Sequence, residues 1–300
     1  MASGLITSYD DTTRTIEARW KYIKALDPNV TVVLTDCDIV PVENTVVSWD
    51  QENIPLTNSI NAGIEGADYI YSDIPNAKLT NYVQKIQRGE KVSYMNRAAD
   101  HPAIANRVQK TALNLMKWCK QDLEYTILNG TAAQGSNAVA ATAGGLQSFV
   151  PGAYTTAATV GTVLDLPTTI GILQKNWNDG GQLDRLLVNA TQKMQRLDQF
   201  TTTINNYQRN IDAMAKKAVF VTDSIVTTFG EVEIMPHRYL ANGAIIGYMK
   251  DFVKIGEYKT FFRDTEVART GDFEPVVIVG YYTVYVGNVR AVAKASGFTG

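Results

Sequence analysis

The side chains that could carry out catalysis are few and lie far apart in the sequence. Of the two histidines, His101 stands beside a proline at the expected start of a helix, and His237 lies in a turn after an expected strand. A general base or a metal ligand needs a partner at a useful spacing, and neither histidine has one. We therefore expect both to be structural residues.

Two short motifs resemble functional sites. Asp36-Cys37-Asp38 resembles an acidic metal-binding triplet at the end of a strand, but it is more simply a polar turn after the apolar run 32–34. Gly180-Gly181-Gln182 resembles a peptide-release motif, yet glycines at this place are typical of the end of a helix. No glycine-rich phosphate-binding loop and no nucleophile-elbow motif occurs in the sequence.

Charge and size limit the class of protein. The sequence has 28 Lys and Arg against 30 Asp and Glu, a net charge of -2. A dedicated nucleic-acid binder normally has a basic excess on at least one domain, so we expect only weak, non-specific contact with nucleic acid. The 45% hydrophobic content is ordinary for a globular chain, and 300 residues allow one large domain or two to three modest ones.

Cysteines and apolar runs indicate the compartment. Cys37 and Cys119 are too few and too far apart for a disulfide framework or a zinc cluster, so we expect two buried, reduced thiols. No apolar run of about 18 residues is present. The start, Met1-Ala2-Ser3-Gly4, does not resemble a signal peptide. The sequence predicts a soluble protein that folds in a reducing cytoplasm, with no membrane partner, cofactor or metal.

Residues 43–98 are polar, strand-prone and poor in apolar side chains. Strands are predicted at 45–50 and 66–71, and the alternation over 83–95 fits a hairpin with water on both faces. An isolated two-stranded ribbon is marginal in water, so this segment must lie on another surface. Its basic residues Lys85, Arg88, Lys91 and Arg97 suit either a phosphate or, more simply, acidic patches on neighbouring copies.

A long amphipathic helix is predicted directly after this segment, over 102–128. Asp100 would cap it, Pro102 suits its first turn, and Asn129-Gly130 would end it. About 27 residues at 1.5 Å each make a rod of about 40 Å. Its apolar positions recur every three or four residues, which gives one continuous stripe: Ile104, Val108, Ala112, Leu115, Met116, Cys119, Leu123 and Ile127.

The flanking regions mix helices and strands. Before the polar segment 43–98, residues 15–26 have helical spacing, and 30–34 form a short β-branched run. The uncharged small-residue tract 130–161 predicts a loop or a segment that lies against another surface. Beyond it, helices are predicted at 167–178 and from Thr191 to Phe200. Strands are predicted at 186–188, 219–222, 225–229, 232–235, 244–249 and 276–293.

Taken in order, these features resemble the tailed-bacteriophage major capsid proteins with the Hong-Kong-97-like (Johnson) fold, in a family formerly catalogued as a domain of unknown function. Segments 44–49, 81–86 and 92–93 look like the family's extended loop, and 122–130 is similar to its spine helix. Residues 188–194 resemble a step in its axial domain, 228–238 a hairpin, and 270–272 with 282–288 its closing segment. Gly280 departs from the pattern, because a carboxylate is expected there.

The resemblance implies an α+β fold in five regions. These are an N-terminal arm (1–42), an extended β-hairpin loop (43–98), a peripheral domain with the spine helix (99–144), an axial domain (145–270) and a C-terminal strand of the peripheral domain (271–300). In this fold the extended loop lies over an adjacent subunit. The candidates for contacts between subunits are Trp49, Lys85, Arg88, Lys91 and Arg97.

The resemblance also implies the function and the partners. Copies of the chain would assemble in the host cytoplasm, as pentamers and hexamers, into the icosahedral head that encloses the double-stranded DNA genome. The partners would be other copies of the chain, a portal, and separate scaffolding or decoration proteins, with only weak contact to packaged DNA.

Three alternatives remain open. An encapsulin-like nanocompartment shell has the same fold but holds enzymes. A cytosolic α/β hydrolase would use Asp36, Asp38 and His237. A tail or fibre component would form tubes or trimers.

Overall fold

The structure is a computed structural model that describes residues 31–54, 62–66, 68–69, 71, 73–98, 106–158, 162–194, 224–269 and 271–299. Its helices are α1 (Val32–Asp36), α2 (Tyr94–Ala98), α3 (Arg107–Asn129) and α4 (Leu166–Asn178). Its strands are β1 (Asp38–Pro41), β2 (Val46–Glu52), β3 (Asn76–Tyr82), β4 (Gln84–Ser93), β5 (Thr155–Ala157), β6 (Arg185–Val188), β7 (Ser224–Thr227), β8 (Gly230–Pro236), β9 (Ile245–Tyr248), β10 (Val253–Asp264), β11 (Phe273–Val286) and β12 (Val292–Ser296).

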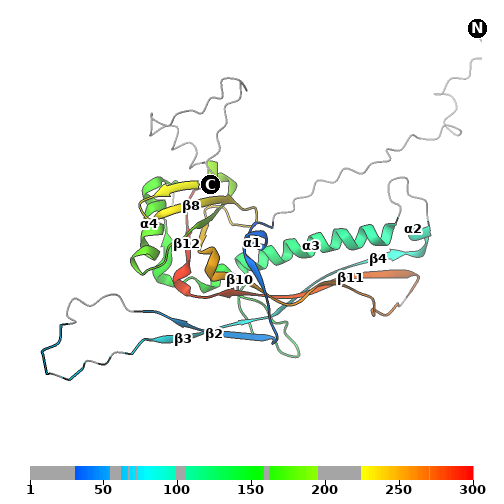
Figure 1. Cartoon of the computed structure of the whole chain (residues 1–300). Helices are drawn as coiled ribbons and strands as arrows, with labels where there is room; N and C mark the ends of the chain where they lie inside the picture. The colour runs from blue at the N-terminus through cyan, green and yellow to red at the C-terminus, as the bar shows by residue number, and fades with distance from the viewer. Residues whose placement is uncertain are drawn as a thin grey trace, which may run out of the picture.

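Two sheets form the body, and a third projects from it (Figure 1). The four-stranded sheet has the order β1-β10-β11-β4 and lies along α3. The six-stranded sheet has the order β5-β12-β9-β6-β8-β7 and carries α4. Strands β2 and β3 pair only with each other among the described strands, and their ribbon extends past the body on the side of the four-stranded sheet away from α3.

The long helix α3 forms largely as predicted. Its stripe of Val108, Leu115, Cys119, Leu123 and Ile127 is buried, and the helix packs on β11 and β4. It begins at residue 107 and not at the predicted 102. The residue before it is extended at φ -141°, and the side-chain oxygen of that residue, an asparagine, accepts the N–H of residue 109 at 3.1 Å. The predicted cap and first turn at 99–105 lie outside the described residues.

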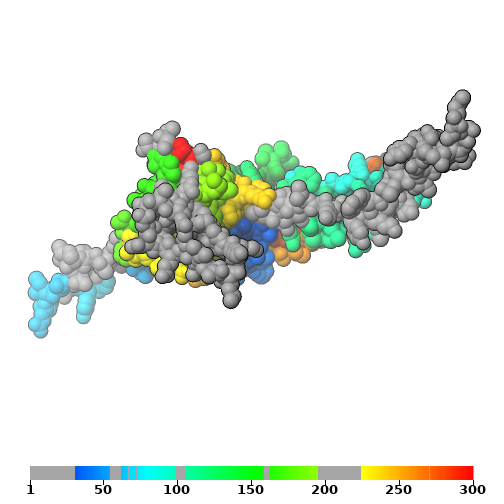
Figure 2. All heavy atoms as spheres, turned by 90° about the horizontal axis from the view of Figure 1, so that it is seen from above, coloured from blue at the N-terminus to red at the C-terminus, as the bar shows by residue number. Residues whose placement is uncertain are grey.

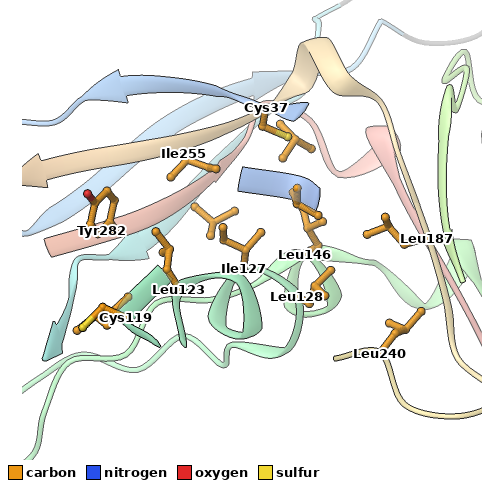
Figure 3. Packing of buried hydrophobic residues seen from close by; sticks show 14 of the residues in the cluster. Cys37, Cys119, Leu123, Ile127, Leu128, Leu146, Leu187, Leu240, Ile255 and Tyr282 are labelled. Carbon is orange, nitrogen blue, oxygen red and sulfur yellow. The ribbon is translucent and has the colours of Figure 1, made fainter. Parts of the chain in front are cut away.

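One continuous core joins the two sheets (Figure 3). Leu123 and Ile127 of α3 face Ile255 and Tyr282 of the four-stranded sheet. The same cluster includes Leu187 and other residues from the six-stranded sheet, all of them buried. The subunit therefore has one main hydrophobic interior across both sheets, and a second cluster lies beneath α4.

The prediction that 83–95 form a hairpin is wrong. Residues 84–93 form the single strand β4, antiparallel to β11, with Ile86 and Val92 buried against α3. Gly89 stands where a turn could lie, but it is inside the strand, where a Cβ would lie 3.2 Å from a methyl group of Val277. The predicted strand at 66–71 is also wrong in its described residues, since β2 pairs with 76–82.

Three other segments also differ from the predictions. The β-branched run 30–34 leads into a helix, α1, because the buried carboxylate of Glu124 accepts the otherwise unpaired N–H groups of Val33 and Leu34. Strand β10 was not predicted from the sequence; it lies inside the predicted axial region 145–270 but belongs to the four-stranded sheet. The predicted strand 276–293 is two strands: β11 ends at residue 286, and β12 belongs to the other sheet.

Helix α4 and strands β6, β7, β8 and β9 confirm the predictions near those positions, with ends that shift by a few residues. The expected helix at 15–26, the strand at 219–222 and the part of the second helix beyond 194 lie outside the described residues. In the described part of the chain, no helix combines the length and apolar character that crossing a bilayer requires.

Packing of α3 on the sheet can be tested with two truncations on this helix. Ile127→Ala leaves a cavity at a fully buried site and is expected to lower the free energy of unfolding by about 2–5 kcal/mol. Leu113→Ala is the control because its side chain is 57% exposed, and it is expected to change stability by less than about 0.5 kcal/mol. Urea denaturation measures both, and equal losses would contradict this description of the core.

Candidate assembly interface

The residues of the hydrolase alternative do not form a site. His237 is buried, and its Nε2 lies 2.8 Å from Oε1 of Glu124. Asp36 instead contacts Arg185, and Asp38 lies on β1. The described residues contain no group of three or more His, Cys, Asp and Glu side chains placed to hold a metal ion. His101 lies outside the described residues.

The cysteines are free and buried, as predicted. Burial raises the pKa of Cys37 to about 12 and that of Cys119 to about 11, so neither thiol is a ready nucleophile. Gly180 confirms the predicted end of a helix, because its φ of +88° is the left-handed conformation that follows α4.

We define the ribbon as residues 46–82, and two side chains, the buried Asn81 and the partly buried Trp49, clamp its root to the body. The Asn81 side chain is fully buried and donates to the carbonyls of Gly144 at 3.0 Å and Val284 at 2.7 Å, while its oxygen accepts the N–H of Gly144 at 2.7 Å. Trp49 packs 4.6 Å from the Tyr285 ring and donates its indole N–H to the Val286 carbonyl at 2.8 Å. The root is therefore part of the body.

Beyond this root, the described residues of the ribbon are not covered by any other described part of the chain. Figure 2 shows its described outer residues standing clear of the body. Ile64, Tyr69 and Tyr71 are 84%, 85% and 88% exposed. Apolar groups in this number on a thin projecting segment are typical of a surface that another molecule covers.

Charge is divided between the ribbon and the four-stranded sheet. The ribbon carries five carboxylates (Asp50, Glu52, Glu65, Asp68 and Asp73) against the single ammonium of Lys78. The basic residues Lys85, Arg88, Lys91 and Arg97 of the predicted extended loop lie outside the ribbon, on β4 and α2. The ribbon itself is acidic, and its acidity is the signal that sequence reasoning missed.

The predicted contact residues face three directions. Arg88 points to α3, where it pairs with Asp122 at 2.6 Å and lies 4.2 Å from the Trp118 ring. Arg97 pairs with Glu274 on the neighbouring strand. Trp49 belongs to the ribbon root.

Lys85 and Lys91 alternate with the buried Ile86 and Val92, so they lie on the sheet face opposite α3. We call the exposed part of this surface, formed by Lys85, Lys91, Lys259, Phe273 and Tyr281, the free face; further along β11, Trp49 covers Tyr285 on the same side. A row of side chains crosses it, because Tyr281 is in register with Lys85 on one side and Lys259 on the other.

The free face combines aromatic rings with ammonium groups. The Lys91 nitrogen lies 4.5 Å from the Phe273 ring, and Tyr258 meets Tyr281 edge-on at 6.1 Å. Lysines 85, 91 and 259 are exposed, and the two rings of β11, Phe273 and Tyr281, are partly exposed. Such a surface has the chemistry to receive an apolar, acidic segment.

Gly280, where the resemblance led us to expect a carboxylate, faces the core side of the same strand. A Cβ there would overlap the Phe261 ring. A carboxylate and this ring cannot occupy the same place, so the departure is a matter of packing.

The architecture of two sheets, one long helix and a projecting ribbon defines the Hong-Kong-97-like capsid class. The capsid of cyanophage A-1(L) matches with a TM-score of 0.74 at 11% identity, covering 98% of this chain and 100% of that one. The capsid of a native GTA particle matches at 0.67 and 9% identity, covering 99% and 100%. The encapsulin SrpI of Synechococcus elongatus matches at 0.61 and 10% identity, covering 98% and 96%.

The chain belongs to the SU10 major capsid protein family, whose model matches residues 7–299. It is a capsid subunit with the Hong-Kong-97-like fold, a structural protein and not an enzyme, and its place is the shell of a virion. No curated protein sequence matches it.

The clamp at the ribbon root can be tested on strand β3. Asn81→Ala leaves buried backbone groups of Gly144 and Val284 without partners, so we expect a loss of about 2–3 kcal/mol in the free energy of unfolding. Asn76→Ala, at an exposed position of the same strand, is the control and should be nearly neutral. Denaturation followed by tryptophan fluorescence compares them, and a neutral Asn81→Ala would show that this amide does not hold the root.

Proposed function

We propose that this subunit assembles as pentamers and hexamers into the icosahedral head that encloses the double-stranded DNA genome of a tailed bacteriophage. The observation that carries the proposal is the ribbon, clamped at its root and exposed along its outer part. A ribbon of two strands buries neither of its faces, so it gains stability only against another surface. In a closed symmetric shell every copy can offer that surface to a neighbour.

The surface that we propose for the neighbour's ribbon is the free face. It offers rings to the ribbon's Ile64, Tyr69 and Tyr71, and ammonium groups to its carboxylates. Each such ion pair is worth only about 0.2–1 kcal/mol at an exposed site. Repetition of the same contact around a closed shell multiplies this small gain. The attraction is also screened over about 10 Å at 0.1 M salt, so assembly should weaken as salt rises.

The partners follow from the same proposal. The near-neutral chain, with its net charge of -2, fits a container that holds packaged DNA only weakly. We propose that a portal and separate scaffolding or decoration proteins complete the head, and that assembly takes place in the host cytoplasm.

The second candidate is a nanocompartment shell, which the encapsulin match favours at a lower TM-score than the phage capsids. Particles purified from expressing cells distinguish the two: enzyme cargo inside them would favour the nanocompartment.

The ribbon contact can be tested by exchanging charges. Lys85→Glu with Lys91→Glu places carboxylates opposite the acidic ribbon, and we expect the yield of closed particles to fall on the order of tenfold. Adding Asp68→Lys and Asp73→Lys to the same chain should restore particles, because the charges are then complementary again. Sedimentation and electron microscopy count the closed particles.

The matched control is Lys117→Glu with Lys120→Glu, which makes the same change of net charge at exposed positions of α3 on the other side of the sheet. It should assemble like the wild type. Equal defects on both sides, or a failure of the ribbon substitutions to restore particles, would contradict the proposed contact.

A further inference from the structure

A fully buried carboxylate joins three separate parts of the subunit. Oε1 of Glu124, on α3, accepts the backbone N–H of Val33 at 2.7 Å, and Oε2 accepts that of Leu34 at 3.0 Å. The third donor is His237, which follows β8 of the six-stranded sheet and lies 2.8 Å from Oε1. The side chains of Glu124 and His237 are both 0% exposed. The spine helix, the start of α1 and the six-stranded sheet therefore meet at one group.

The hydrogen bonds determine how the histidine is protonated. The backbone N–H of Tyr239 donates to Nδ1 of His237 at 3.2 Å, so that nitrogen is an acceptor. The ring proton is then on Nε2 and is donated to Glu124. The backbone N–H of His237 also donates to the Val188 carbonyl at 2.8 Å, which ties the histidine to β6. Glu124 thus receives three N–H groups, which suits a carboxylate.

The other end of α1 is held by a second carboxylate. Asp36 accepts the Tyr248 hydroxyl at 2.9 Å, the Lys250 ammonium at 3.0 Å and Nε of Arg185 at 3.1 Å. Burial raises the pKa of Asp36, but hydrogen bonds from these three groups outweigh burial and hold the pKa below its ordinary value. Tyr248 and Arg185 belong to the six-stranded sheet, on β9 and β6.

We propose that α1 is a strap whose two carboxylate contacts couple the position of residues 31–41 to the angle between the two sheets, and through that angle to the curvature of the shell. A rotation of the six-stranded sheet against α3 would pull His237 away from Glu124 and would move the partners of Asp36. Both sets of bonds hold only in one arrangement. From α1 the chain continues into β1, which pairs with β10 of the four-stranded sheet. The strap therefore contacts α3 and both sheets of the body.

The test replaces the carboxylate with an amide of the same size. Glu124→Gln replaces one acceptor oxygen with an N–H2 group, which faces either Leu34 alone or both Val33 and His237, so at least one of the three hydrogen bonds is lost. In the unassembled subunit, hydrogen exchange at the amides of Val33 and Leu34 should rise on the order of tenfold. In assembled particles, the distribution of diameters in electron micrographs should broaden. The control is Glu231→Gln, the same chemical change at an exposed position of β8, and both of its readouts should match the wild type.

The link between the strap and shell curvature rests on the proposed function, but the two measurements test the strap and the shell separately. Unchanged exchange at residues 33 and 34 would overturn the strap, and faster exchange with unchanged diameters would overturn its link to curvature. If Glu124→Gln does not fold, Asp36→Asn tests the other end at a partly exposed site, where exchange at residues 36 and 37 should rise. A wild-type chain that forms no closed particles would refute the proposed function. The hydrogen-exchange measurement on the unassembled subunit would still test the strap.

Discussion

The main constraint on this subunit is a two-stranded ribbon whose root is held rigidly and whose outer part has no covering layer among the described residues. The buried Asn81 amide joins the ribbon to β11 and to the loop after α3, so the ribbon leaves the body in a fixed direction. Beyond that point there is too little sheet to bury Tyr69 or Tyr71. Within the described residues nothing covers this part of the ribbon, and in the proposed shell of identical subunits a neighbouring copy would supply the surface.

The body of the subunit supports the projecting ribbon. One core runs from Ile255 beneath α3 to Leu187 in the second sheet, so the two sheets share one buried interior behind the ribbon root. The division of charge would favour contact between the ribbon of one copy and the free face of another, because the carboxylates lie on the ribbon and lysines such as Lys85 lie on the free face. Arg88, by contrast, is already paired with Asp122 and contributes to the stiffness of its own subunit.

Sequence reasoning succeeded where local pattern and final packing agree. The apolar stripe of α3 repeats at helical spacing and lies on a sheet, and the order of segments was enough to identify the capsid class. It failed where a distant partner decides. Residues 84–93 alternate as a wet hairpin would, but Ile86 and Val92 gain a covering helix that no nearby residue indicates. The run at 32–36 became helical because Glu124, about ninety positions away, accepts its first N–H groups. The clamp of Asn81 could not be predicted either, since a lone asparagine in a polar strand gives no sign that it is buried.

The most direct measurement is hydroxyl-radical labelling of the ribbon tyrosines in closed particles and in dissociated subunits of the same preparation. Tyr69 and Tyr71 are almost fully exposed on the single chain, so the free subunit should label strongly at both. If a neighbour covers the ribbon, labelling in particles should fall several-fold, roughly in proportion to the surface that is lost. Equal labelling in the two states would mean that the ribbon stays uncovered in the shell, and assembly through the ribbon would be contradicted.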